Sequence, residues 1–215
     1  MVEFIQNLIG NDKIATLLMS FIPLIELKGG IIFARGAGLG FFESFSLSYL
    51  GSTIAFIPVF FLLVPILDLL KKIKWFKAFA DKVENYFKDK ADGALEKAKK
   101  SGKKARTETF YKMLGTFIFV AIPLPMTGVW TGTAVAVFLG LKFKDAILPV
   151  IIGNFIAGAI ISVLAEIIIA LSSDFVAAKA ILDGVLWGLF ALAAIMLIIV
   201  IIKILRKKKS TAEEK

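Results

Sequence analysis

The sequence predicts an all-α integral membrane protein, on the basis of its composition, the placement of its charges and its long uncharged segments. Apolar residues make up 58% of the 215 residues, and the mean hydropathy is +0.84. Soluble proteins contain roughly 45–50% apolar residues even when glycine is counted. A soluble domain of this length could not bury so much apolar surface, so the composition nearly excludes a water-soluble enzyme, and we expect no enzymatic activity.

The net charge of +9 is concentrated in two segments that should face the cytoplasm. Residues 71–112 contain 14 Lys and Arg against 6 Asp and Glu, and residues 203–215 contain 6 against 2. Lys and Arg gather in this way at the cytoplasmic flanks of membrane helices. Nucleic-acid binding would also explain a basic protein, but the basic blocks flank apolar spans, so we expect no nucleic-acid partner. The absence of Cys and His from the sequence removes the usual metal ligands, and we expect no cofactor and no metal.

Three segments are expected to cross the bilayer, which takes about 20 apolar residues. They are residues 47–70, 146–171 and 184–202. Two other apolar segments, at about 22–45 and about 114–141, are interrupted by Pro, Gly and polar residues. A broken helix at membrane depth survives only where protein or a water-filled cavity surrounds it. We therefore interpret both interrupted segments as re-entrant hairpins that enter and leave on one face.

The charge pattern supports this topology. If residues 71–112 and the tail at 203–215 both lie in the cytoplasm, the chain between them crosses the membrane an even number of times. The spans 146–171 and 184–202 supply two crossings, so the segment 114–141 should not cross. The span 47–70 then runs from outside to inside, and the first hairpin dips into the membrane from outside.

The two halves of the chain resemble each other, which predicts an inverted repeat. Each half has a broken hairpin, a short polar connector and a clean span, as many secondary transporters do, with the binding site between the repeats. Three matches carry the alignment: Ile22-Pro23-Leu24 with Ile122-Pro123-Leu124, Leu39-Gly40 with Leu139-Gly140, and, after a two-residue slip, Gly51 with Gly153.

Residues 71–112 predict a basic amphipathic helix and linker outside the bilayer. Apolar residues recur at three- and four-residue steps beside a Lys-rich face. Two interpretations remain open: the helix lies on the anionic cytoplasmic leaflet, or it packs on the membrane domain. In the first interpretation the membrane-surface residues are Trp75, Phe76 and Phe79.

Glu26, Lys28 and Arg35 are the unusual residues, because each lies in a segment that the bilayer should cover. A charge at the bilayer centre costs roughly 2.5–3.5 kcal/mol on insertion scales, and such residues usually line transport pathways. If the first hairpin turns at Gly29-Gly30, Glu26 and Arg35 lie on opposite arms and could pair, either for function or only to fix the hairpin. Glu166 and Asp68 are weaker candidates that should lie near the membrane interfaces.

The second hairpin offers hydroxyl groups and unwound backbone but no charge. Such groups can bind an ion or a head group. The predicted substrate or ion site therefore draws on both breaks and on the following span, and it consists of Pro23, Gly29, Gly30, Pro123, Pro125, Thr127, Gly128, Trp130, Thr131, Gly132 and Asn154.

The two broken motifs resemble those of a known family. The sequence IPLIELKGG at 22–30 resembles the P-x-x-E-L-[RK]-G element of the bacterial and archaeal small multidrug export proteins, and PLPMTGVWTG at 123–132 resembles their P-L-P-G-T-G-x-W-T-G element, with Met126 where Gly is usual. The family in turn resembles DedA-type membrane proteins, which have two facing re-entrant hairpins. This resemblance implies proton-dependent transport or lipid-carrier flipping, and the family name implies export.

The sequence thus predicts a proton-coupled transporter of a small substrate, with Glu26 as the proton carrier and Arg35 as its partner or as a head-group ligand. Two alternatives remain open: a translocase of an anionic lipid carrier such as a polyprenyl phosphate, which Lys28 and Arg35 would favour, and a non-transporting membrane scaffold. The expected location is a prokaryotic inner membrane, and the expected partners are membrane lipids, protons, the substrate and, as one option, a second copy of the chain.

Overall fold

The computed structural model describes residues 2–23, 25–70, 108–124 and 127–172, together with isolated residues between 72 and 92 and between 177 and 195. This part of the chain contains seven helices and no strand, which confirms the all-α class. In chain order the helices are α1 (Val2–Ile9), α2 (Asp12–Phe21), α3 (Glu26–Gly36), α4 (Phe41–Leu70), α6 (Glu108–Ala121), α7 (Val129–Phe138) and α8 (Phe143–Leu171).

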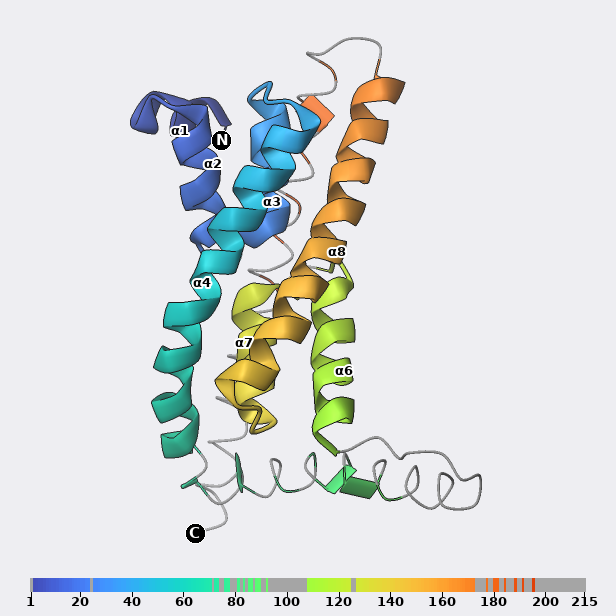
Figure 1. The fold of residues 1–215 in the computed structure, drawn as a ribbon. Helices are drawn as coiled ribbons and strands as arrows, with labels where there is room; N and C mark the ends of the chain where they lie inside the picture. The colour runs from blue at the N-terminus through green and yellow to red at the C-terminus, as the bar shows by residue number, and fades with distance from the viewer. Residues whose placement is uncertain are drawn as a thin grey trace, which may run out of the picture.

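Helices α4 and α8 are the two described helices that are long and apolar enough to cross a membrane. They contain 30 and 29 residues, and at 1.5 Å per residue each is roughly 45 Å long, more than the roughly 30 Å of a bilayer core. They run in opposite directions over the full height of the molecule (Figure 1). Both begin a few residues before the predicted spans 47–70 and 146–171, because the polar connectors that precede those spans are themselves helical.

Two pairs of short helices pack against α4 and α8. The pair α2–α3 lies in the upper half of Figure 1 and the pair α6–α7 in the lower half. Within each pair the helices are joined by a non-helical break that contains proline, Pro23 in the first and Pro123 in the second. Proline disfavours helical backbone in the residue before it, so α2 and α6 end just ahead of these residues. Both breaks lie near mid-height (Figure 1).

The turn of the first pair is not where the sequence predicted it. Gly29 and Gly30 lie inside α3, and the chain reverses instead at residues 22–25. Helix α3 needs glycine at position 30 because a Cβ there would overlap the Ser20 hydroxyl and lie 3.0 Å from Ser48 Oγ. The pairs therefore extend over residues 12–36 and 108–138 rather than over 22–45 and 114–141.

The two short-helix pairs end in similar backbone contacts. Leu39 N donates to Ala34 O, and Leu141 N donates to Ala136 O, each at 3.0 Å. Gly38 and Gly140 precede these leucines, with φ angles of +90° and +71°. These two contacts are 102 residues apart in the sequence. The second break is longer than the first.

Two glycines let each short-helix pair approach its long helix. Gly51 of α4 lies against the Leu17 backbone of α2, where a Cβ would be 3.1 Å from the Leu17 carbonyl carbon. Gly153 of α8 lies against the Phe117 backbone of α6, where a Cβ would be 3.0 Å from the Phe117 oxygen. Small residues at such positions allow close packing where no hydrophobic force drives helices together.

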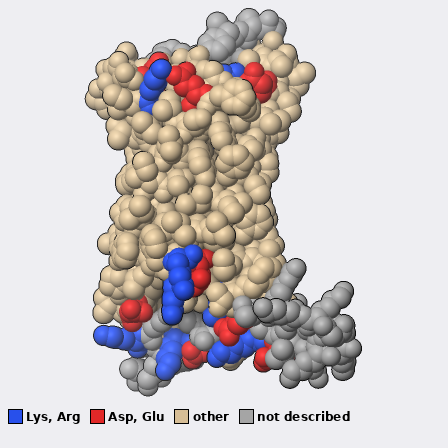
Figure 2. All heavy atoms as spheres, viewed as in Figure 1, with Lys and Arg blue, Asp and Glu red and all other residues tan. Residues whose placement is uncertain are grey.

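The surface has an uncharged belt between two charged ends. In the face shown by Figure 2, Lys, Arg, Asp and Glu lie near the top and in the lower part, with uncharged residues between them. Large apolar side chains of α4 and α8 are exposed, and a lipid environment would cover them. Among them are Leu50, Ile54, Ile57, Phe61, Leu62, Leu148, Ile152, Phe155, Val163, Leu164 and Ile167.

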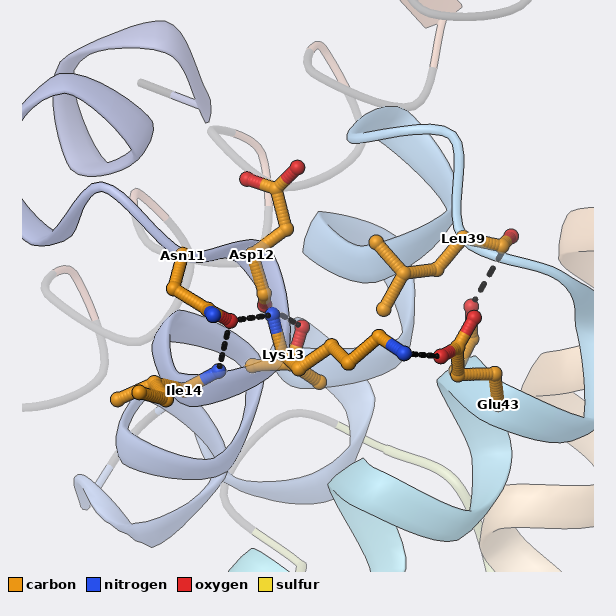
Figure 3. Close-up of polar contacts among 8 residues, drawn as sticks. Asn11, Asp12, Lys13, Ile14, Leu39 and Glu43 are labelled. Atoms are coloured by element: carbon orange, nitrogen blue, oxygen red, sulfur yellow. Dashed lines mark hydrogen bonds and ion pairs between the residues drawn. The ribbon is translucent and has the colours of Figure 1, made fainter.

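Polar contacts join α2, α4 and the connector before α4 at the upper end of the molecule (Figure 3). The Asn11 side chain accepts hydrogen bonds from Lys13 N and Ile14 N at 3.0 and 3.1 Å, which makes it the N-cap of α2. Lys13 forms an ion pair with Glu43 at 2.6 Å, and the two side chains are 64% and 39% exposed. This pair belongs to the polar end of the molecule, away from the breaks.

The remaining predictions fall on residues outside the described part of the chain. These include most of the amphipathic helix at 71–112, with Trp75 and Phe79, as well as the tail at 203–215 and nearly all of the predicted span 184–202. Phe76 is described, and its ring packs edge-on against Phe138 of α7 with the ring centroids 5.8 Å apart. For this residue, contact with the membrane domain accords with the second of the two interpretations.

Candidate functional site

The two breaks meet, and charged residues of the first contact the backbone of the second. Glu26, the first residue of α3, is buried with 4% of its surface exposed. Its carboxylate oxygen Oε1 accepts a hydrogen bond from Trp130 N at 3.0 Å. Trp130 is in the first turn of α7, where backbone N–H groups have no partner within the helix and the helix dipole favours an anion.

Glu26 acts as an N-cap supplied by the other pair of helices. The N-terminal cap position of α7 is Gly128, which has no side chain that could accept from the α7 backbone. The Glu26 carboxylate takes the place of that side chain, and a Cβ on Gly128 would overlap Oε2 and lie 2.5 Å from the carboxyl carbon. Thr131 Oγ1 completes the cap by accepting from Gly128 N at 3.1 Å.

Lys28 contacts the other side of the same break. Its ammonium group donates to Leu124 O at 2.6 Å and to Thr127 O at 2.5 Å, and it lies 3.3 Å from Thr127 Oγ1. Only 5% of the Lys28 surface is exposed. The break thus binds an anionic group at the start of α7 and a cationic group on the carbonyls that follow α6.

Trp130 makes the reverse contact, from the second pair to the first. Its indole Nε1 donates to Phe21 O, at the end of α2, at 2.9 Å. The Trp130 and Phe21 rings pack edge to face, with centroids 6.4 Å apart. Each break therefore accepts a hydrogen bond from a side chain of the other pair, and these hydrogen bonds hold the two breaks together.

The backbone at Glu26 is unusual. Glu26 has a φ of +49° and is the one described residue other than glycine with a positive φ. Non-glycine residues held in sparsely populated backbone regions cost of order 1–3 kcal/mol and cluster at functional sites. In this conformation the Glu26 carboxylate contacts α7.

The predicted pairing of Glu26 with Arg35 is wrong. Because residues 26–36 form one helix, Arg35 lies nine residues further along it, about 13 Å away at the helical rise. Arg35 forms an ion pair with Glu166 of α8 at 2.6 Å and also donates to Leu39 O. Glu166, a weaker candidate in the sequence, is therefore the partner of Arg35 near the upper end of the molecule.

Asn154 stabilises the crossing of the long helices rather than the breaks. Its Nδ2 donates to Ser52 Oγ at 2.7 Å and lies 3.3 Å from Thr53 Oγ1. Asn154 is 1% exposed, and such interhelical hydrogen bonds average about 0.6 kcal/mol in membranes. Sequence reasoning could not identify Ser52 and Thr53 as its partners, because neither interrupts an apolar segment with a charge.

The other predicted site residues do not all lie where the two breaks meet. Thr127, Gly128, Trp130 and Thr131 lie where the two breaks meet. Pro23 and Pro123 are in the breaks, whereas Gly132 packs against Val120 of α6. Pro125 is not among the described residues.

Within the described part of the chain, no group of three or more Asp, Glu, His or Cys residues could bind a metal ion. The acidic side chain at the meeting point is Glu26, and its surroundings are backbone donors and acceptors. The arrangement places an anionic side chain at the start of α7 and a cationic side chain on the carbonyls that follow α6.

The helices and this site define a class, that of all-helical membrane proteins in which two broken helix pairs meet between two long membrane-capable helices. A family profile described as "Putative small multi-drug export protein" matches residues 26–160. The chain belongs to this family, as its two broken motifs predicted. The matched range begins at Glu26, directly after the first break, and includes the second break. Comparisons with curated proteins and with solved structures each gave no match.

Proposed function

We propose that this protein is a proton-coupled membrane transporter that exports a small substrate through the region where the two breaks meet. The observation that carries the proposal is the buried Glu26 carboxylate on the first turn of α7, where it accepts from Trp130 N at 3.0 Å. A titratable group buried at membrane depth is costly, and such groups usually mark proton relays or substrate pathways. The direction of transport is taken from the family name.

The proposal includes an inverted repeat of re-entrant hairpins. Three features support it: α4 and α8 run in opposite directions, the two short-helix pairs occupy opposite halves of the molecule (Figure 1), and equivalent backbone hydrogen bonds recur 102 residues apart. Helix α6 starts and α7 ends at the same end of the molecule in Figure 1, as expected of a segment that enters and leaves on one face.

The charge pattern orients the protein in its membrane. With residues 71–112 and the C-terminal tail in the cytoplasm, the pair α6–α7 enters from the cytoplasmic face and α2–α3 from the opposite face. The proposed location is the inner membrane of a prokaryote. The proposed partners are membrane lipids, protons and a small substrate, and the proposed role is transport rather than enzymatic catalysis.

Glu26 can couple protons to substrate because protonation changes its charge without removing its hydrogen-bond acceptor. The ionised carboxylate complements the positive end of α7. After protonation the carbonyl oxygen can still accept from Trp130 N, but the attraction to the helix dipole is lost. Proton binding would thereby loosen the contact between the breaks, and release of the proton would restore it.

The structure favours a small substrate over an anionic lipid carrier. Flipping a phosphate-bearing lipid requires cationic groups that are available to the phosphate. Lys28 already donates to backbone oxygens of the second break, and Arg35 donates to Glu166 and Leu39. Both candidate cations are therefore engaged with oxygen partners of the protein itself.

Glu26→Gln tests the proposal with little change in shape, because glutamine keeps an oxygen that can accept from Trp130 N. Acid-loaded proteoliposomes that contain DNA are diluted into alkaline buffer with ethidium, and ethidium uptake is followed by its fluorescence. We expect wild-type protein to drive uptake that collapses when the proton gradient is dissipated, and Glu26→Gln to give the rate of protein-free vesicles.

Glu43→Gln is the matched control, since it removes the same charge from the exposed pair with Lys13 and should keep the wild-type rate. A Glu26→Gln rate equal to wild type would exclude Glu26 as the proton carrier. Thermal unfolding of the three proteins shows whether each is folded, and we expect Glu26→Gln to unfold close to the wild-type temperature.

A further inference from the structure

The oxygen atoms around Lys28 form a compact cluster of acceptors. Leu124 O, Thr127 O and Thr127 Oγ1 lie 2.6, 2.5 and 3.3 Å from the ammonium nitrogen. A primary ammonium group has three N–H donors, so the number of acceptors matches the number of donors. The Thr127 hydroxyl also lies 2.6 Å from Ile122 O, and this contact fixes its place in the cluster.

The break itself supplies part of the hydrogen bonding of this cluster. Leu124 O also accepts from Thr127 N at 3.2 Å and lies 2.8 Å from Thr127 Oγ1, which accepts from Leu124 N at 3.1 Å. The cluster follows α6, near a helix C-terminus where the dipole places partial negative charge, so its oxygens favour a cation. The Lys28 side chain, 5% exposed, places a positive charge at this position.

The equivalent position in the other half carries no charge. Lys28 and Trp130 are 102 residues apart, which is the register of the backbone hydrogen bonds that the two halves share. Trp130 donates a single neutral N–H to Phe21 O, and Lys28 donates a charged group to three oxygens. A neutral N–H group is therefore enough for the contact in one half. The positive charge of Lys28 in the other half needs a separate explanation.

We propose that Leu124 O, Thr127 O and Thr127 Oγ1 form a binding site for a primary ammonium group, which Lys28 occupies as a tethered ligand. In transport, the ammonium group of a small amine substrate takes the place of Lys28 when α3 withdraws from the second break. This names one substrate class of the proposed transporter, beside drugs such as ethidium that carry no ammonium group, and to that extent rests on the proposed function, but occupancy of the site can be tested without transport.

Lys28→Met vacates the site while it keeps an unbranched side chain of similar length. Thermal unfolding of the purified full-length protein is measured with methylammonium chloride and, at equal ionic strength, with tetramethylammonium chloride, which has no N–H donor. We expect methylammonium to raise the unfolding temperature of Lys28→Met by about 2–4 °C over tetramethylammonium, and to leave the wild type unchanged.

Lys13→Met is the matched control, because it removes a lysine from the same helix pair, one whose side chain is 64% exposed and paired with Glu43. Its unfolding temperature should be the same in the two salts. Equal responses of Lys28→Met to both salts would overturn the proposal, and so would a methylammonium effect of the same size in the wild type or in Lys13→Met.

A measurement on folded wild-type protein covers the case in which Lys28→Met does not fold. With 15N-labelled lysine, the Lys28 ammonium should give a side-chain signal protected from exchange with water, lost in Lys28→Arg and kept in Lys13→Arg. Absence of such a signal would contradict the tethered ligand. If Lys28→Met binds methylammonium but Glu26→Gln still transports, the ammonium site stands and the proton-carrier role of Glu26 is excluded. If Lys28→Met does not bind methylammonium and Glu26→Gln does not transport, only the proposed substrate class is excluded.

Discussion

Replacing Gly128 with alanine should displace the Glu26 carboxylate and abolish proton-driven uptake. The new Cβ would overlap Oε2 and lie 2.5 Å from the carboxyl carbon, inside a site where Glu26 is 4% exposed. The Gly128 backbone is extended, a conformation that alanine also adopts, so the cost comes from the added methyl group. We expect a loss of about 2–5 kcal/mol from overpacking together with the lost charge-assisted hydrogen bond.

Two further variants separate this clash from a general effect of adding a methyl group. Gly40→Ala adds the same group where no atom lies within 4 Å, and it should unfold and transport as the wild type does. In a Glu26→Ala background the space beside Gly128 is open, so Gly128→Ala should cost much less there than alone. Equal costs in the two backgrounds would show that Glu26 does not lie against Gly128.

Replacing Gly30 with alanine should also destabilise the protein, although alanine is the better helix former by about 1 kcal/mol. The added Cβ would overlap the Ser20 hydroxyl and lie 3.0 Å from both Ser20 Cβ and Ser48 Oγ. The Ser20 hydroxyl can rotate away only by giving up its 2.7 Å hydrogen bond to Thr16 O, and the contact with Ser20 Cβ would remain. We expect a net loss of about 1–3 kcal/mol, measured by thermal unfolding in detergent.

This variant also distinguishes the two placements of the first turn. If residue 30 lies inside α3, the alanine clashes with Ser20 of α2. Adding Ser20→Ala should then recover part of the lost stability, because it removes the overlapping atom. If residues 29–30 formed an exposed turn, Ser20→Ala would recover nothing. A neutral or stabilising Gly30→Ala would contradict the packing of α3 against α2.

Hydropathy predicted the two long helices of the fold, and proline marked the two breaks. The spans later found as α4 and α8 are uncharged over most of their length, and a signal of that length does not depend on what packs against it. Proline fixed the ends of α2 and α6. The turn at Gly29-Gly30 was predicted wrongly because a Gly-Gly pair suits both a turn and a close helix contact. Only the distance to Ser20 decides between them.

The sequence singled out two charged residues of the first break but not the groups that they contact. Glu26 and Lys28 stood out because charge is rare in apolar segments. Their partners are mainly backbone groups, Trp130 N, Leu124 O and Thr127 O, and every residue carries such groups, so no side-chain pattern identifies them. The pair of Arg35 with Glu166 joins residues 131 positions apart, which sequence spacing alone cannot align.

Glu26 caps α7 across the meeting point of the two breaks, Lys28 fills the carbonyl cluster behind it, and both contacts would have to open for a substrate to pass. Glu26 is proposed to open them by taking up a proton. Proton movement and substrate movement should therefore be obligatorily linked in the wild type, and the link should depend on Glu26 rather than on overall charge.

The most direct test reverses the driving force. Proteoliposomes at equal pH on both sides, loaded with the pH-sensitive dye pyranine, receive a pulse of ethidium outside. For wild type and Glu43→Gln, the inward ethidium gradient should drive protons out and make the lumen alkaline. Glu26→Gln should give no change in lumenal pH. Ethidium entry without proton movement in the wild type, or an equal lumenal response in Glu26→Gln, would contradict proton coupling through Glu26.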